Sequence, residues 1–380
     1  MTINRPSLKP PFRDKIALLR GMFTNEYAYI GPFHVTIDTS KQCNLKCLGC
    51  RYQDRQIDFT SLGGQNVINI SIDMIKQLFN DLKPMGTNAI ILTGEGEPFL
   101  HPQLFDIISE VKKNRYHLTL RTNGTLLSES KAHKLIDNKV DILKVSLWAT
   151  KPDEYQQLYP GVSSELFQKT LDGLKMVSRI KKIRKSQFPR VVIHQVINKY
   201  NYQTIHNMID LAHNANCNSV YFAPFKAWEG KLTNTFLSSE EENILFDLLV
   251  SAKNKAEALN IGHNIDSALL RFKTGPNVWE SFPCYLGWFH ARIKLDGTVL
   301  PCDPCGIKMG NLNDNRIFDI WNSTEYRKFR KKGLTYKGLL KLNQNSDCSY
   351  CCHLANNARI HKIVKWIRPI LIQKGDDDDV

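Results

Sequence analysis

The sequence predicts an α/β fold built on a parallel sheet, followed by a small cysteine-rich region. Three observations support this prediction. Short apolar stretches alternate with amphipathic helical stretches from His34 to Ala223, polar loops follow several of these stretches, and nine of the ten cysteines fall in three groups. Strands that alternate with helices form βαβ units, and these build a parallel sheet that is either doubly wound or curled into a barrel.

Six strands are expected from their apolar and β-branched composition. They cover His34 to Asp38, Asn88 to Leu92, His117 to Arg121, Ile142 to Trp148, Arg190 to Ile197 and Ser219 to Ala223. The helices between them are indicated by apolar residues three or four positions apart, as in Ile72, Ile75, Leu78 and Phe79. In both kinds of parallel sheet the chemistry gathers at the carboxyl ends of the strands, so the loops after the first three strands should meet there.

The cysteines indicate a metal or redox role rather than a disulfide framework. The chain has no run of eighteen apolar residues, and its first twenty residues carry prolines and charges where a signal peptide would need an apolar core. We therefore expect a cytoplasmic protein with reduced thiols, in which grouped cysteines bind a metal or do chemistry. Cys217 stands alone before an apolar strand and is interpreted as a buried structural thiol.

The net charge of +14 comes mainly from scattered Lys and Arg, with denser stretches at Lys181 to Lys185 and Arg327 to Lys332. We interpret these stretches mainly as solvated helix faces. The alternative is a field that attracts an anionic partner. No nucleic-acid module is recognisable, so a nucleic-acid partner is not expected.

The first cysteine group, Cys43, Cys47 and Cys50, places three thiols within eight positions of a loop that follows the first strand. A structural zinc site needs four ligands, and no histidine lies nearby to complete one. A four-iron, four-sulfur cluster held by three thiolates instead leaves one iron open for a further ligand.

Cys43-x-x-x-Cys47-x-x-Cys50 after a first strand resembles the signature of the radical SAM superfamily, whose open iron binds S-adenosylmethionine (SAM). The turn after the second strand resembles the end of that family's Gly-Gly-Glu-Pro turn. The resemblance implies that the SAM pocket is lined by Gly96, Glu97, Pro98, Thr122, Asn123 and Ser146. It also implies a partial (β/α)6 TIM-like barrel. The chain departs from the family at Gly49, where many relatives carry an aromatic residue, and at Glu95, where they carry glycine.

A second constellation resembles the SPASM/twitch extension of the same superfamily. Cys284, twelve residues, Gly297, four residues and Cys302 fit its opening motif, and Cys348-x-x-Cys351 supplies a second pair. Because Cys352 is the last cysteine, we interpret the region as the shorter twitch form with one auxiliary 4Fe-4S cluster. The expected ligands are Cys284, Cys302, Cys348 and Cys351. Cys305 and Cys352 stay unplaced, and a zinc site is the alternative.

The expected domain organisation has five parts. They are a lead-in with one short helix (1–33), the radical SAM partial barrel (34–236), a connecting helix and linker (237–275), the SPASM/twitch-type domain (276–353) and a basic amphipathic tail (354–380). We expect a hairpin at Asp296-Gly297 and little apolar core in residues 276–353. The tail helix should be broken by Pro369 and could make peripheral contact with a membrane, while Asp376 to Asp379 should be disordered.

The resemblance implies that a reduced cluster cleaves SAM to a deoxyadenosyl radical, which abstracts a substrate hydrogen, with flavodoxin or ferredoxin as a typical reductant. The lead-in is too short for a leader-binding domain, which favours a small-molecule substrate that is anionic or sugar-like. A sugar, aminocyclitol or lipid-linked precursor would be dehydrogenated, with the auxiliary cluster accepting an electron. A peptide-modifying enzyme and a non-catalytic iron-sulfur or zinc protein are the alternatives. Candidate substrate-side residues are His194, Gln195, Tyr221, Trp288 and His290.

Overall fold

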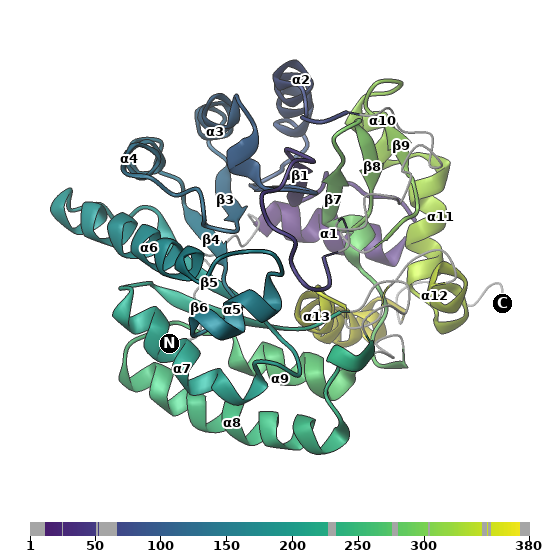
Figure 1. Ribbon diagram of the computed structural model, residues 1–380. Coiled ribbons are helices and arrows are strands. Elements are labelled where there is room, and N and C mark those ends of the chain that lie inside the picture. The colour runs from purple at the N-terminus through teal and green to yellow at the C-terminus, as the bar shows by residue number, and fades with distance from the viewer. Residues whose placement is uncertain are drawn as a thin grey trace.

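The computed structural model describes residues 12–24, 26–50, 52, 67–226, 233–275, 280–302, 305–343, 348 and 351–372. Within these residues the centre is one sheet of nine strands in the order β6-β5-β4-β3-β2-β1-β7-β8-β9 (Figure 1). The strands are β1 (His34–Asp38), β2 (Ala89–Thr93), β3 (His117–Thr122), β4 (Ile142–Ser146), β5 (Arg190–Ile197), β6 (Ser219–Pro224), β7 (His290–Ile293), β8 (Thr298–Leu300) and β9 (Gly310–Asn311). Neighbours from β6 to β7 are parallel, whereas β8 and β9 continue antiparallel. The described sheet has two edges, so the predicted α/β partial barrel is confirmed.

Helices cover the outer face of the curved sheet (Figure 1). The α-helices of the described residues are α1 (Phe12–Phe23), α2 (Ile72–Leu82), α3 (Leu104–Lys113), α4 (Glu129–Asp137), α5 (Pro152–Leu158), α6 (Glu165–Ile183), α7 (Ile205–Asn214), α8 (Ser239–Ala258), α9 (Ile265–Thr274), α10 (Ile317–Trp321), α11 (Thr324–Gly333), α12 (Tyr336–Asn343) and α13 (Leu354–Ile372). On β4, Leu143 and Val145 are fully buried in the core, while the alternate residues Ile142, Lys144 and Ser146 stay partly exposed on the inner face. The sheet therefore has a helix-covered apolar face and a polar inner face.

Local signals located the ends of several elements correctly. All six expected strands are present, and two of them, His34–Asp38 and Arg190–Ile197, have the predicted bounds. Helix α8 begins with a capping box in which the Ser238 hydroxyl accepts from the Glu241 amide and the Glu241 carboxylate accepts from the Ser238 amide. The expected hairpin joins β7 to β8, and its turn residue Gly297 has a φ of +82°.

The expectation of little apolar core in residues 276–353 was wrong. Trp288, Trp321 and Tyr326 are fully buried, and β7 pairs directly with β1, so this region extends the barrel sheet. The indole of Trp321 donates to the carbonyl of Ile30 at 2.8 Å. Large aromatic residues spread among turns can build a core when a neighbouring segment, here the chain before β1, covers them.

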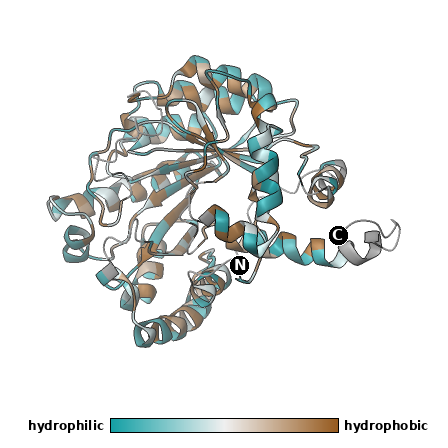
Figure 2. Cartoon of the chain, turned by 90° about the vertical axis from the view of Figure 1, so that its right-hand side faces the viewer, coloured by the Kyte–Doolittle hydropathy of each residue, from teal (hydrophilic) through white to brown (hydrophobic). Residues whose placement is uncertain are grey.

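The tail forms one helix, α13, which continues through Pro369 to Ile372, so the predicted break at Pro369 was wrong. Figure 2 shows this helix leading away from the body of the molecule, and the Trp366 side chain is 80% exposed. Among the described residues, none of the helices has the length and apolar character that crossing a bilayer requires. The Asp376 to Asp379 run lies outside the described residues.

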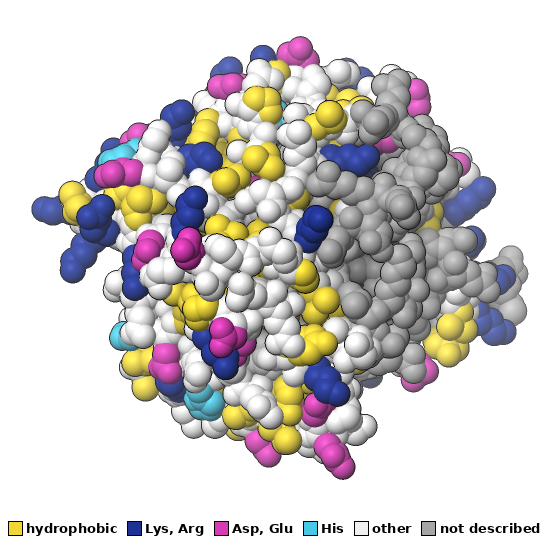
Figure 3. Space-filling view, in the orientation of Figure 1, with side chains coloured by type: hydrophobic (Ala, Val, Ile, Leu, Met, Phe, Trp, Pro, Cys, Tyr) yellow, Lys and Arg dark blue, Asp and Glu magenta, His cyan; other side chains and the backbone are white. Residues whose placement is uncertain are grey.

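Basic and acidic side chains are intermixed over the face seen in Figure 3. The Lys and Arg residues there do not gather into one patch. This distribution favours the interpretation of the surface charge as solvated helix faces.

Candidate functional site

The first three cysteines lie on the loop that follows β1. Two backbone bonds hold this loop: the amide of Leu48 donates to the carbonyl of Leu158 at 2.8 Å, and that of Cys50 to Cys47 at 3.1 Å. Burial, together with the neighbouring thiols of Cys50 and Cys43, raises the pKa of the Cys47 thiol well above its ordinary value. Three thiols close enough to act on one another form a donor set suited to an iron-sulfur cluster, which would bind them as thiolates.

Gly49 stands where many relatives carry an aromatic residue, and here an aromatic ring from another part of the chain covers it. Its φ is +72°, and the ring of Phe225, which follows β6, occupies the space that a Cβ would need. An aromatic ring therefore lies against the loop, but it comes from a distant strand.

The turn after β2 lies directly against the cysteine loop. The amide of Gly96 donates to the carbonyl of Ser40 at 2.9 Å, and the amide of Glu97 donates to that of Gln42 at 2.7 Å. A Cβ at position 96 would overlap the Gln42 carbonyl, so only glycine fits there. Gly96, Glu97 and Pro98 are thus held beside the three thiols.

The Glu97 carboxylate joins the end of β2 to the end of β3. It is buried and accepts hydrogen bonds from the Thr122 hydroxyl at 2.6 Å, the Asn123 amide at 2.7 Å and the Phe99 amide at 3.1 Å. Burial raises the pKa of Glu97, and these hydrogen bonds oppose the rise. We infer that Glu97 has a positioning role, since its oxygens are taken up by the protein itself.

Asn44, between the first two cysteines, connects the loop to the turn that follows β3. Its side-chain carbonyl accepts from the Asn123 amide group at 2.9 Å, and its own amide group donates to the Thr125 hydroxyl at 2.8 Å. Sequence reasoning missed this residue, although an amide side chain inside a cysteine loop was a visible signal. Ser146 ends β4 on the same edge of the sheet, in register with His194 of β5.

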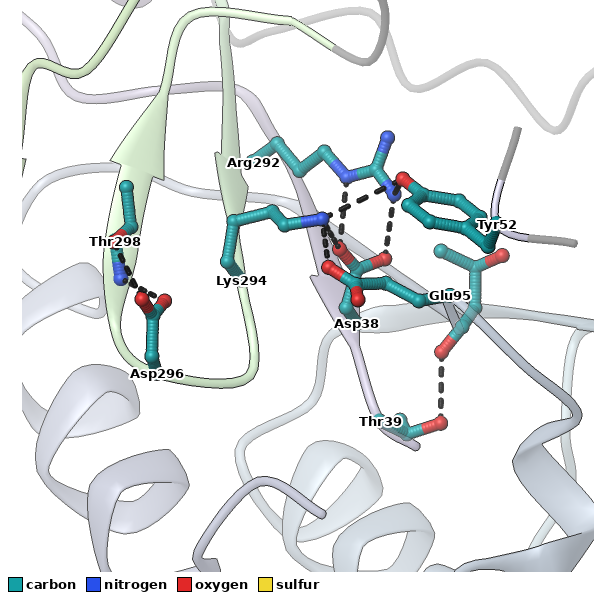
Figure 4. A network of polar contacts seen from close by, with 9 residues as sticks. Asp38, Thr39, Tyr52, Glu95, Arg292, Lys294, Asp296 and Thr298 are labelled. Carbon is teal, nitrogen blue, oxygen red and sulfur yellow. Dashed lines mark hydrogen bonds and ion pairs between the residues drawn. The ribbon is translucent and has the colours of Figure 1, made fainter. Parts of the chain in front are cut away.

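A buried network of charges lies where β1 ends, just before the cysteine loop (Figure 4). Asp38 has no exposed surface, and its carboxylate accepts from Arg292 at 2.7 and 3.1 Å. Lys294 lies 3.2 Å from the same carboxylate and also pairs with Glu95. The Tyr52 hydroxyl accepts from Arg292 at 3.0 Å. Glu95, a departure from the family turn, therefore has a cationic partner in Lys294, the residue directly after β7.

The neighbouring cations favour the ionised form of the Asp38 carboxyl group. Burial alone would raise the pKa of Asp38, but Arg292 and Lys294 outweigh it and the pKa is lowered. Sequence reasoning missed all three residues. Their signal was present: Arg292 and Lys294 alternate within an apolar strand, which places both on the same face, and Asp38 ends a buried strand.

Apart from Cys217, the remaining six cysteines converge in a second group. Burial and the thiols of Cys351, Cys305 and Cys352 raise the pKa of Cys284 to about 12. The pKa of Cys302 is also raised, first by a hydrogen bond with Cys305 and by burial, and then by the neighbouring thiols of Cys305, Cys348 and Cys284. The four predicted ligands, Cys284, Cys302, Cys348 and Cys351, are thus brought together, but so is the buried Cys305, whereas Cys352 is exposed. Among the described residues, no three His, Cys, Asp or Glu side chains are arranged to hold a single metal ion.

The candidate substrate-side residues separate into two kinds. His194 and Tyr221 lie partly exposed on the inner face, with ring centroids 5.4 Å apart. The other three are fully or almost fully buried, and Gln195 points to the opposite face of β5 from His194. The Trp288 indole donates to the Tyr27 carbonyl at 3.3 Å. Both ring nitrogens of His290 have partners, the Thr36 hydroxyl and the Pro301 carbonyl, each at 3.0 Å.

The open-edged α/β barrel with a three-thiol loop at its carboxyl edge and a second thiol group defines an iron-sulfur protein. The model of the radical SAM superfamily matches residues 37–212, and that of the iron-sulfur cluster-binding SPASM domain matches residues 284–357. The chain belongs to the radical SAM superfamily, in the subgroup with a SPASM domain. Its cofactors are therefore SAM, the 4Fe-4S cluster that binds it and an auxiliary 4Fe-4S cluster.

Two relatives and one solved structure show how far the likeness extends. An AdoMet-dependent heme synthase of Methanosarcina barkeri is 24% identical over 315 residues, covering 79% of this chain and 85% of that protein. A tungsten-containing aldehyde ferredoxin oxidoreductase cofactor-modifying protein of Pyrococcus furiosus is 23% identical over 337 residues, covering 83% and 89%. The structure of native anSMEcpe with bound AdoMet has a TM-score of 0.63 at 17% identity, covering 90% of this chain and 98% of that one. This last likeness concerns the fold alone.

Proposed function

We propose that this protein is a radical SAM dehydrogenase of a small molecule, such as a sugar, aminocyclitol or lipid-linked precursor. In this proposal Cys43, Cys47 and Cys50 hold the SAM-binding cluster. The SAM pocket is lined by Gly96, Glu97, Pro98, Thr122, Asn123 and Ser146. The auxiliary cluster is held by Cys284, Cys302, Cys348 and Cys351.

One observation carries the proposal: Arg271 of α9 acts electrostatically on both His194 of the inner face and Cys351 of the auxiliary thiol group. One side chain therefore lies within electrostatic reach of both. Helix α9 also packs against both β6 and α13, the helix that follows Cys351, so a group held by the auxiliary thiols would lie on the β6 side of the barrel. This arrangement favours an oxidation in which the auxiliary cluster takes an electron.

When bound, SAM and the cluster held by Cys43, Cys47 and Cys50 would supply the radical chemistry that removes a hydrogen atom from the substrate, using one electron from a reductant such as flavodoxin or ferredoxin. Cys284, Cys302, Cys348 and Cys351 would hold the cluster that accepts the second electron of the dehydrogenation, which also releases one proton from the substrate. The chain's own residues orient the loop and turn through Glu97 and Asn44, and the buried strands exclude water from the loop's base.

The names of the two curated relatives favour a small-molecule substrate over a peptide. One is named for heme synthesis and the other for modifying the cofactor of a tungsten enzyme. A peptide is the competing substrate class, because the likeness to solved structures concerns the fold alone and does not distinguish the two kinds of substrate.

Anaerobic reconstitution tests the proposal. The protein reduced by dithionite in the presence of SAM should form deoxyadenosine, measured by liquid chromatography and mass spectrometry. Replacing Cys43, Cys47 and Cys50 together by alanine should abolish deoxyadenosine and lower the iron content from about eight to about four per chain. Cys217→Ala is the matched control, because this buried thiol stands outside both groups. Intact clusters without deoxyadenosine from the native sequence would contradict the enzyme proposal.

A further inference from the structure

The inner face of the sheet is partly exposed on the side of β3 to β6. Inner-face residues of these strands stay partly exposed, whereas their alternates pack in the core beneath the helices. The partly exposed residues are Arg121, Lys144, His194 and Tyr221, and the fully buried alternates are Leu120, Val145, Ile193 and Phe222. On the side of β1 and β7, by contrast, the inner-face residues are themselves buried, as Asp38 and Arg292 show. Interiors of small barrels are ordinarily filled by side chains, so an accessible stretch of inner face indicates room for a ligand.

Positive side chains from three elements meet on this partly exposed side. Arg121 of β3 and Lys144 of β4 are partners in the strand register. The Lys144 ammonium lies 3.5 Å from the centroid of the Tyr221 ring on β6, and Tyr221 is the register partner of His194. Arg271 lies on α9, which packs against β6; it is 94% buried and acts electrostatically on His194.

The charges that act on His194 come from these residues. Burial, followed by the charges of Lys144, Arg121 and Arg271, lowers the pKa of His194 well below its ordinary value. The imidazole is therefore neutral at pH 7 and can serve as a hydrogen-bonding group. Three positive side chains that act on one place create a field that favours an anion there.

We propose that Arg121, Lys144 and Arg271 hold an oxyanion of the substrate, a phosphate or a carboxylate, with His194 and Tyr221 as its neutral neighbours. Guanidinium groups bind such oxyanions through two parallel hydrogen bonds, and the ammonium adds a point charge. That the bound anion belongs to the substrate rests on the proposed function. Its position suits that role, since Ser146, expected in the SAM pocket, is the register partner of His194.

Anion binding to the anaerobically reconstituted full chain tests the site. Inorganic phosphate and succinate are titrated separately by calorimetry, with chloride holding the ionic strength constant. We expect saturable binding of at least one of them, and the preferred probe tells phosphate from carboxylate chemistry. The affinity for the preferred probe should fall about tenfold or more in each of three variants, Lys144→Met, Arg121→Met and Arg271→Met, because each loses a charge-assisted hydrogen bond.

Two controls separate a lost ligand contact from a lost fold. Lys182→Met removes an exposed positive charge from α6 and should leave binding unchanged. Lys144→Arg keeps the charge and should restore binding relative to Lys144→Met. Equal binding by Lys144→Met and the native chain, or no binding of either probe by the native chain, would overturn the site.

The carboxylate of SAM is the other anion that could occupy this place. Saturating phosphate or succinate should leave the affinity of the native chain for SAM unchanged, and displacement of SAM would overturn the assignment to substrate. The experiments distinguish failure of the anion site from failure of the proposed enzyme activity. Probe binding with the expected variant pattern but no deoxyadenosine from the native chain would retain the anion site and reject the enzyme proposal.

Discussion

At the end of β1, the fully buried carboxylate of Asp38 balances two cations brought by the strand β7 and the residue after it, Arg292 and Lys294. A buried charge is tolerated only when it is paired and hydrogen-bonded. The pairing also spans the boundary between the two family matches, since Asp38 lies in the first and Arg292 in the second. The position of the cysteine loop therefore depends on a charge contact between distant parts of the chain.

Asp38→Asn should lower the free energy of unfolding by about 3 to 5 kcal/mol, because it leaves the buried Arg292 guanidinium without its carboxylate and Lys294 with Glu95 alone. Urea unfolding measures the change. Asp137→Asn is the control: Asp137 pairs with Arg184 on the surface, so its replacement should cost about 1 kcal/mol or less. Similar losses from the two variants would show that the buried network contributes no more than a surface pair.

Gly49→Ala should destabilise the cysteine loop by about 2 kcal/mol or more, because a positive φ disfavours alanine and the new Cβ meets the Phe225 ring. Urea unfolding and the iron content after reconstitution report the loss. Gly161→Ala provides the comparison, since its φ is +82° with no atom within 4 Å of the added Cβ. If both substitutions cost the same, the contact with Phe225 is not what excludes a side chain at position 49.

At the scale of elements, local chemistry was a good guide where an element begins or ends through its own residues. Helix α8 begins where Ser238 and Glu241, three positions apart, form a capping box. Helix α13 shows the opposite case, because it continues through a proline that we expected to break it. The local preference of a proline does not always decide where a helix ends.

Ser238→Ala should lower the free energy of unfolding by about 1 kcal/mol, since the first turn of α8 loses its side-chain acceptor. Urea unfolding is the measurement. Ser239→Ala, one residue later, keeps both bonds of the capping box and should change stability by less. An unchanged midpoint for Ser238→Ala would mean that α8 does not depend on this cap.

At the scale of the whole molecule, three cysteine-bearing segments meet in one place: that before β7, that after β8 and that before α13. Six thiols converge there, although a 4Fe-4S cluster takes four. Burial favours Cys351 over Cys352 as a ligand, because the Cys352 residue is exposed and burial raises the pKa of Cys351 to about 12.

Cys351→Ala should therefore reduce the iron content from about eight to about four per chain, while Cys352→Ala should keep about eight. Iron assay and the visible absorption of the reconstituted protein give the result. Loss of iron in Cys352→Ala with retention in Cys351→Ala would reverse the assignment.

The sequence by itself determined the class of fold, the three-thiol loop with its adjacent turn and the presence of a second thiol group. These features are local: strand and helix periodicity, cysteine spacing and turn chemistry are all written within short windows. The polar residues of the inner face, Arg121 and Lys144, could likewise be read as alternating strand positions. The sequence could not show which of these side chains would lie close together in the folded protein.

Only the tertiary structure decided the long-range pairings. Asp38 and Arg292 are 254 positions apart, and Phe225 covers Gly49 from a distant strand. The apolar core of residues 276–353 also depends on a partner far away, the segment before β1. Contacts at such separations leave no periodic signal in the sequence. Each depends on which strands lie next to one another, and only the folded sheet determines that.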